Sequence, residues 1–167
     1  VNNSNDPLSF RLGDPKFMNY ANAFYRPVNG VTGVMELQPG QVNWGEINPQ
    51  PQPGAVRMWL YHAWAAGSDF ACTYRYRQPL YGSEQYHAGI VGTDGVTPSQ
   101  GGLEYQQFMR EIQKLRKAYV NNPDLPAVLQ HRKTAILWNH ENWWDLDFQK
   151  QTNQWNTFNH MSKYLDA

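Results

Sequence analysis

The sequence is poor in cysteine and in charged residues, and both shortages restrict its function. A single cysteine, Cys72, among 167 residues cannot form an internal disulfide bond, so no disulfide framework holds the fold. Charged side chains make up 17% of the chain, with 14 basic residues balancing 14 acidic ones. This balance excludes the clustered basic surface that nucleic acids and acidic lipids require. No apolar run is long enough to cross a bilayer, so we expect neither a nucleic-acid nor a membrane partner.

Aromatic residues are abundant instead, at 14% of the chain, with 7 Trp and 10 Tyr. One explanation is a large hydrophobic core. The other is a sugar-binding site, because the apolar C–H faces of pyranose rings stack on Trp and Tyr side chains. Composition alone leaves both explanations open.

Helices and strands alternate along the first 122 residues. Prolines at helix starts, glycines at helix ends and β-branched runs predict helices at 14–25, 53–67 and 101–120, and strands at 31–37 and 69–77. This order implies right-handed crossovers and a parallel sheet. Because two strands cannot form such a domain alone, the sheet is either completed elsewhere or belongs to the end of a (β/α)₈ barrel.

A break at Asn121-Asn122-Pro123 marks the predicted domain boundary. Residues 123–167 have the pattern of a second α/β unit that opens with a strand at 133–138 and continues to a helix at 155–165. We interpret the polar and aromatic stretch between them as a strand end with interface aromatics.

Two residues near the first strand are candidates for chemistry. Glu36 ends an apolar strand just before Pro39-Gly40, which places a carboxylate at the mouth of a parallel sheet, where a nucleophile belongs. The alternative is an ordinary polar residue that closes a strand. Trp44 lies in the following loop, and either stacks on a sugar or pins the loop.

A second pair of candidates lies in the loop after the second strand. Glu84 and His87 are three residues apart and are expected to point the same way, toward vicinal hydroxyl groups or toward a zinc ion. No third ligand follows at a standard zinc spacing, so we expect neither a metal nor a cofactor. Residues 74–77 alternate Tyr and Arg, which is weak support for nucleic-acid binding. We expect these arginines to orient carboxylates.

Several of these motifs together resemble glycoside hydrolase family 42. The segment MELQPGQVNWGEINPQPQPGAVRMW is followed by YRYRQPLYGSEQYHAG, and these two segments carry the four candidate residues. RLGDPKFMNYANAFYRP is similar to the helix before the seventh barrel strand of that family. KTAILWNHENWWDL is similar to the opening of its second domain. The resemblance implies an α/β chain: the carboxyl-terminal portion of a (β/α)₈ TIM barrel, strands seven and eight with flanking helices, over residues 1–122. The start of an α/β trimerisation domain follows over residues 123–167.

The resemblance also implies an activity, that of a retaining β-galactosidase hydrolysing terminal β-D-galactosides by double displacement. Glu36 matches the nucleophile, Trp44 a Trp that lines the galactose subsite, and Glu84 and His87 a Glu and a His that hydrogen-bond sugar hydroxyls. Residues 74–77 are candidates for favouring the ionised state of Glu36. The family is bacterial in type, and either a cytoplasmic or a periplasmic location is compatible with the sequence.

The general acid/base of this family lies at the end of the fourth barrel strand, which we expect to precede Val1. The isolated chain, as a fragment, is therefore expected to be inactive. The parent protein is expected to be a homo-oligomer, a trimer. Two barrel strands alone leave edges and apolar faces open, so we expect the isolated chain to associate with other copies. The alternative function is a non-catalytic carbohydrate-binding or oligomerisation module.

Overall fold

The computed structural model describes residues 9–29, 32–119 and 133–165, and the chain divides into two compact units, Val1–Ala118 and Tyr119–Ala167. The predicted boundary between residues 122 and 123 lies outside the described residues. The elements in chain order are α1 (Ser9–Leu12), α2 (Pro15–Asn29), β1 (Gly33–Leu37), α3 (Ala55–Ala65), β2 (Phe70–Thr73), α4 (Gln100–Tyr119), α6 (His140–Phe148) and α7 (Thr157–Leu165).

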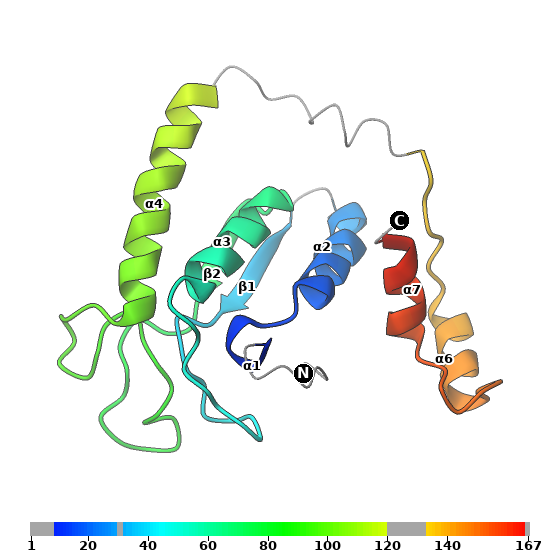
Figure 1. The fold of residues 1–167 in the computed structure, drawn as a ribbon, viewed down its shortest axis with the longest axis horizontal. Helices are drawn as coiled ribbons and strands as arrows, with labels where there is room; N and C mark the ends of the chain where they lie inside the picture. The colour runs from blue at the N-terminus through cyan, green and yellow to red at the C-terminus, as the bar shows by residue number, and fades with distance from the viewer. Residues whose placement is uncertain (1–8, 30–31, 120–132, 166–167) are drawn as a thin grey trace. The chain divides into compact units, whose positions relative to one another are not determined.

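The first unit contains two parallel strands, β1 and β2, joined through α3 (Figure 1). Gly33 pairs with Phe70, and Leu37 pairs with Thr73 after a shift in register. The predicted parallel pairing is therefore confirmed, but the second strand is shorter than predicted. It ends at Thr73, so residues 74–77 leave the regular ladder.

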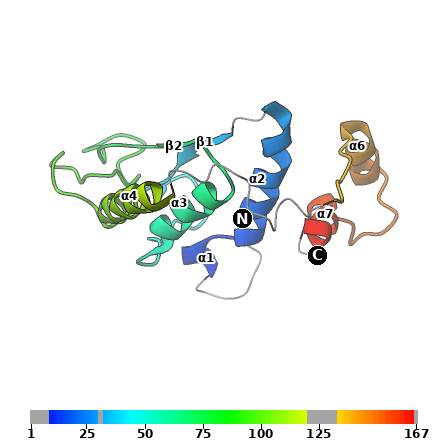
Figure 2. The same cartoon turned by 90° about the horizontal axis from the view of Figure 1, so that it is seen from above.

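The core of the first unit lies where α3 and α4 pack together, as the view from above shows (Figure 2). Val56 and Leu60 of α3 contact Phe108 and Ile112 of α4, and all four side chains are buried. These positions are four residues apart in each helix, so they lie on one helical face. Burial of side chains of this size stabilises the unit by about 1.5–3 kcal/mol each.

A buried carboxylate from α4 holds the first turn of α3. The N-cap of α3 is Gly54, which has no side chain to accept hydrogen bonds from the helix. Glu104, only 8% exposed, replaces that cap: Oε1 accepts from the Gly54 N–H at 2.8 Å and Oε2 from the Arg57 N–H at 2.9 Å. A negative charge at this end of a helix is also favoured by the helix dipole.

Arg57 and Glu111 form a second link between α3 and α4. Two hydrogen bonds of 2.8 and 2.9 Å join the guanidinium group to the carboxylate. The Tyr61 hydroxyl donates to the same carboxylate at 2.6 Å. These bonds, with the one to Arg57 strongest, lower the pKa of the Glu111 carboxyl to about 2.

Two glycines let the first turn of α4 approach the loops that follow the strands. A Cβ atom on Gly101 would lie 1.6 Å from the Pro39 carbonyl oxygen, and one on Gly102 would lie 2.0 Å from that of Ile90. No side chain fits at those distances. Pro39 follows β1 closely and Ile90 lies in the loop after β2, so the start of α4 fixes both loops.

The second unit contains two described helices, α6 and α7, and departs from the prediction. Residues 133–138 were expected to form a strand but have no regular secondary structure. A strand needs a second strand to pair its backbone hydrogen-bonding groups, and the described part of this unit offers none. The stretch interpreted as a strand end is α6, which Asn139 caps by accepting a hydrogen bond from the Asn142 N–H at 2.7 Å.

Candidate functional site

The loops that carry the predicted site residues follow β1 and β2 and lie at the same end of the sheet (Figure 1). Glu36 is the penultimate residue of β1, and its side chain is exposed. The Gln38 side-chain amide donates a 2.7 Å hydrogen bond to Glu36 Oε1. The carboxylate is thus held at the strand end while remaining accessible.

Tyr74 stands beside Glu36 because its backbone ties the two strand ends together. Its N–H donates to the Leu37 carbonyl oxygen at 3.3 Å, which places the first residue after β2 against the end of β1. The pKa of the Tyr74 phenol is raised, first by its hydrogen bond to Glu84 and also by the nearby charge of Glu36. Tyr74 therefore connects the end of β1, through its backbone, with Glu84, through its hydroxyl group.

Glu84 receives two hydrogen bonds on one oxygen. The Tyr74 hydroxyl and the Arg75 guanidinium each donate to Oε2 at 2.7 Å. The peptide bond between Tyr74 and Arg75 is cis. In a strand, the alternation of Tyr and Arg over residues 74–77 would place the two residue types on opposite faces, but here the side chains of Tyr74 and Arg75 approach the same carboxylate. The opposite-face arrangement fails because the strand has already ended at Thr73.

The expected role of the arginines holds for only one of the two. Arg75 forms an ion pair with Glu84, as predicted. Arg77 instead donates from Nε to the Thr93 carbonyl oxygen at 3.0 Å. It therefore holds the backbone of its own loop rather than a carboxylate.

His87 is packed against the Tyr74 ring. It is 1% exposed, and the two rings meet edge to face with centroids 5.1 Å apart. Its Nδ1 lies 3.1 Å from the Ala88 carbonyl oxygen, while Nε2 is buried without a hydrogen-bond partner among the described residues. With the proton on Nδ1, Nε2 is an acceptor, and a hydroxyl group is the kind of donor that would satisfy it.

Trp44 lies in the loop after β1 with 70% of its surface exposed. An exposed indole does not contribute to the core, so the interpretation that it pins the loop by burial is not favoured. The Trp44 ring is open to a ligand. Its loop is joined to the loop of Glu84 by a hydrogen bond from the Asn43 side chain to the Ser83 carbonyl oxygen.

The structure thus brings Glu84 and His87 against Tyr74, which bonds through its backbone to Leu37 next to Glu36. The sequence had marked Tyr74 only as one of four neighbours. No local signal marked this role, because the sequence predicted that the second strand continues to residue 77, whereas β2 ends at Thr73. The spacing between residues 74 and 84 gave no indication of the hydrogen bond between Tyr74 and Glu84.

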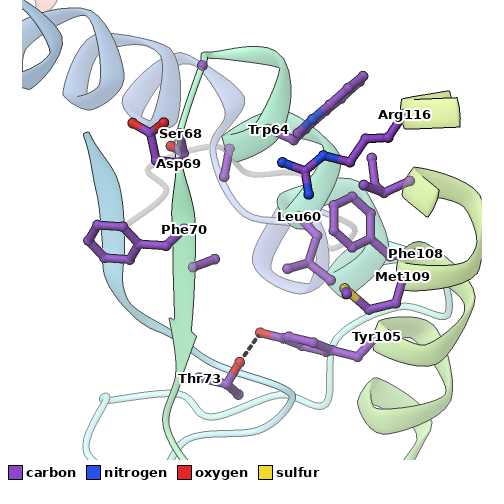
Figure 3. Close-up of a pocket in the computed structure, with 14 residues that line it drawn as sticks. Leu60, Trp64, Ser68, Asp69, Phe70, Thr73, Tyr105, Phe108, Met109 and Arg116 are labelled. Atoms are coloured by element: carbon purple, nitrogen blue, oxygen red, sulfur yellow. Dashed lines mark hydrogen bonds between the residues drawn. The ribbon is translucent and has the colours of Figure 1, made fainter. Parts of the chain in front are cut away.

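A cavity of about 640 Å³ lies elsewhere, between β2, α3 and α4 (Figure 3). Leu60 and Phe108 form part of its apolar wall. At one end, the Thr73 hydroxyl donates to the Tyr105 hydroxyl at 2.7 Å, and burial raises the pKa of the Tyr105 phenol to about 12. None of the four predicted site residues lines this cavity.

The described residues offer neither a cluster of metal-binding side chains nor a membrane-spanning helix. No three His, Cys, Asp or Glu side chains in that part of the chain are grouped so that they could hold a metal ion. Nor does any described helix combine the length and the hydropathy needed to cross a membrane.

Comparison with known proteins points to one family. A family model described as β-galactosidase, that of glycoside hydrolase family 42, matches residues 4–115. β-Galactosidase BgaA of a Thermus species is 36% identical over 146 residues, which are 87% of this chain and 21% of that protein. β-Galactosidase BgaH of Haloferax lucentense is 34% identical over 158 residues, which are 94% of this chain and 22% of that protein. The chain spans about a fifth of the length of these curated relatives.

Solved structures show the same relationship. The β-galactosidase from the Antarctic haloarchaeon Halorubrum lacusprofundi aligns with a TM-score of 0.78 and 30% identity, over 97% of this chain and 23% of that one. The β-galactosidase from the psychrophilic Marinomonas ef1 aligns with a TM-score of 0.77 and 30% identity, over 92% of this chain and 25% of that one. The small α/β arrangement with two parallel strands therefore matches part of these structures.

Proposed function

The chain belongs to glycoside hydrolase family 42, and we propose that it carries the nucleophile and part of the sugar site of a retaining β-galactosidase. The observation that carries this proposal is that Glu84 and His87 contact Tyr74, whose backbone bonds to the last residue of the strand that carries Glu36. Functional residues of (β/α)₈ barrels lie at the carboxyl ends of strands and in the loops that follow. These residues occupy such positions on two neighbouring parallel strands.

We further propose that β1 and β2 are the seventh and eighth strands of the barrel, followed by α3 and α4. Two cavities flank the sheet and support this assignment. One, of about 640 Å³, is bounded by β2, α3 and α4, and the other, of about 460 Å³, lies between α2 and β1. Each lies between the sheet and a helix, where side chains of a neighbouring barrel strand would pack. The second unit would then open the trimerisation domain of a homotrimeric parent protein.

In the proposed mechanism, Glu36 attacks the anomeric carbon of a β-galactoside while the bond to the leaving oxygen breaks. The product is a galactosyl-enzyme ester, which water then hydrolyses with net retention of configuration. A second carboxyl group protonates the leaving oxygen and later takes a proton from water. In retaining enzymes the two carboxyl groups lie about 5 Å apart. We assign that second group to a part of the parent protein outside this chain.

The other predicted residues would hold the sugar. Trp44 offers an exposed indole face for the apolar side of the galactose ring. Glu84, with both protein donors on Oε2, can accept a sugar hydroxyl on Oε1. His87 would accept another hydroxyl at Nε2, an atom that is buried without a hydrogen-bond partner among the described residues.

Glu84 is a poor candidate for the missing acid/base. Its Oε2 already accepts hydrogen bonds from Tyr74 and Arg75 at 2.7 Å, whereas a general acid must present a proton to the leaving oxygen. This contrast supports a binding role for Glu84 and leaves nucleophilic attack to Glu36.

Covalent labelling tests the proposal. An activated 2-deoxy-2-fluorogalactoside should inactivate the full-length enzyme, because the fluorine slows both the formation and the hydrolysis of the ester and the activated leaving group speeds only the formation. Mass spectrometry of peptides should then find the sugar on Glu36. A stable label on another carboxyl group would refute the assignment.

The exposed Trp44 would also suit a non-catalytic carbohydrate-binding module. Labelling of the full-length enzyme and calorimetry on the isolated chain together separate the two functions. A module would bind galactose in calorimetry without ever forming a covalent label. Labelling of Glu36 in the full-length enzyme, together with no detectable binding of millimolar galactose by the isolated chain, would favour the enzyme.

A further inference from the structure

The side chain of Asn43 links the two loops that carry the proposed sugar site. Asn43 directly precedes Trp44 in the loop after β1. Its side-chain amide donates a hydrogen bond to the Ser83 carbonyl oxygen, in the loop after β2. Ser83 directly precedes Glu84, so one side chain links the neighbour of the proposed stacking residue to the neighbour of the proposed hydroxyl acceptor.

A second bond joins the same loops on the other side of the Glu84 turn. The Ala88 N–H donates to the Gln41 carbonyl oxygen at 2.8 Å, and Ala88 directly follows His87. The two links therefore bracket the segment from Glu84 to His87. Within it, the His87 N–H donates to the Glu84 carbonyl oxygen at 2.9 Å, which closes the segment as a turn.

The side chain of Asn43 has a buried polar atom that costs stability, which is not expected of a residue with a purely structural role. Its Oδ1 is buried and has no hydrogen-bond partner among the described residues. Buried polar atoms are rarely left unpaired, and exceptions concentrate where function restricts the choice of residue. Asn48, in the same loop, contrasts with it: both of its amide atoms bond to Gly45, at 2.9 Å each.

We propose that Asn43 is a positioning residue of the galactoside site, which sets the Glu84 carboxylate relative to the Trp44 ring. This inference rests on the proposed function of that site. A sugar held between an indole face and a carboxylate requires both to be placed to within about 0.5 Å. The backbone bond from Ala88 ties the Trp44 loop to the far end of the turn, and the Asn43 side chain ties it to the end nearer Glu84.

The test compares Asn43→Ala with Asn48→Ala in the full-length enzyme. Both variants remove one amide from the same loop, but only the first breaks a link to the other loop. Hydrolysis of nitrophenyl β-galactoside should show KM raised about tenfold by Asn43→Ala, the loss of one hydrogen bond, with a smaller change in kcat. The Asn48→Ala variant should keep KM within about twofold, and the thermal midpoints of the two variants should agree.

A double-mutant cycle with Glu84→Gln shows whether Asn43 acts through Glu84. If it does, the KM penalty of Asn43→Ala should shrink to near onefold once Glu84 is replaced. An equal penalty in both backgrounds, or an equal effect of Asn48→Ala, would overturn the role of Asn43. If Asn43→Ala does not fold, Asn43→Leu is measured in its place, because it has a similar branched shape and lacks the amide donor.

Failure of this inference is distinguishable from failure of the proposed function. An unaltered full-length enzyme that does not hydrolyse β-galactosides would overturn the proposed function, and the role of Asn43 with it. An active enzyme in which Asn43→Ala behaves like Asn48→Ala would overturn the role of Asn43 alone.

Discussion

The hydroxyl group of Tyr74 donates a 2.7 Å hydrogen bond to Oε2 of Glu84. Arg75 donates to the same oxygen at 2.7 Å, so among the described residues Oε1 receives no such bond. The ring of Tyr74 also packs edge to face on His87. One side chain thus orients two of the proposed sugar-binding groups, and its removal has a specific expected cost.

Replacing Tyr74 by Phe should lower kcat/KM for β-galactosides about tenfold in the full-length enzyme. The change removes one hydrogen bond to a charged group and keeps the ring that packs on His87. The loss should be larger for galactosides than for deoxygalactosides that lack the hydroxyl bound by Glu84. Steady-state kinetics with a set of deoxygenated substrates measures it.

Tyr105→Phe is the matched control for that variant. The Tyr105 hydroxyl accepts a 2.7 Å hydrogen bond from Thr73, the residue next to Tyr74, but lies at the cavity between the helices and β2. This variant should leave kcat/KM within about twofold. Equal losses in the two Tyr variants would mean that Tyr74 acts only on the fold.

Much of the first unit could be predicted from local sequence features. The strand that ends at Glu36 and the helix after Pro53-Gly54 follow from turn residues and apolar periodicity, which are properties of short segments. The end of β2 at Thr73 could not be predicted, because Tyr and Arg beyond it also favour strands. The contacts of Tyr74 with Glu84 and His87 depend on where β2 ends, so these contacts could not be predicted either.

In the second unit, the local sequence pattern predicted a strand that the structure does not contain. Residues 133–138 have a composition that favours a strand, but pairing is a property of the whole sheet and no local pattern supplies it. The helix α6 was missed because its aromatic and acidic residues form no single apolar stripe. Asn139 as its N-cap and Glu141 in its first turn were the signals that could have indicated it.

Replacing Gly101 by Ala should destabilise the protein despite the better helix propensity of Ala. The added Cβ would lie 1.6 Å from the Pro39 carbonyl oxygen, and backbone on both sides must move. We expect a loss of at least about 1–3 kcal/mol in the free energy of unfolding. Chemical denaturation of the full-length protein provides the measurement.

Gly92→Ala serves as the comparison for that substitution. A Cβ atom there would meet its nearest neighbours at 3.8 Å, an ordinary contact. Its unfolding free energy should stay within about 0.5 kcal/mol of the original protein. If Gly101→Ala were as stable as Gly92→Ala, the close approach of α4 to the loop after β1 would be incorrect.

The stability of the first unit should fall at acidic pH partly through Glu111. Its carboxyl pKa is lowered from 4.5 to about 2, chiefly by the hydrogen bond from Arg57. Between those values the unfolded chain binds a proton that the folded chain does not. The stabilisation is therefore complete above pH about 4.5 and is lost as the pH falls toward about 2.

Urea denaturation at several pH values tests this link. The midpoint for Glu111→Gln should fall less between pH about 6 and about 3 than the midpoint of the original protein. Some decrease should persist, because the pKa of Asp94 is also lowered to about 2, first by the hydrogen bond from Thr97. Parallel decreases in the two proteins would contradict the assigned role of the Arg57–Glu111 pair.

Rescue of a Glu36→Ala variant by azide tests the central claim most directly. In the full-length enzyme the variant should lose activity by several orders of magnitude, as the removal of a covalent nucleophile does. With an activated β-galactoside, azide should enter the space of the lost carboxylate, restore turnover and yield the α-galactosyl azide, because it attacks opposite the leaving group. Near-normal activity without azide, or a β-galactosyl azide product, would show that Glu36 is not the nucleophile.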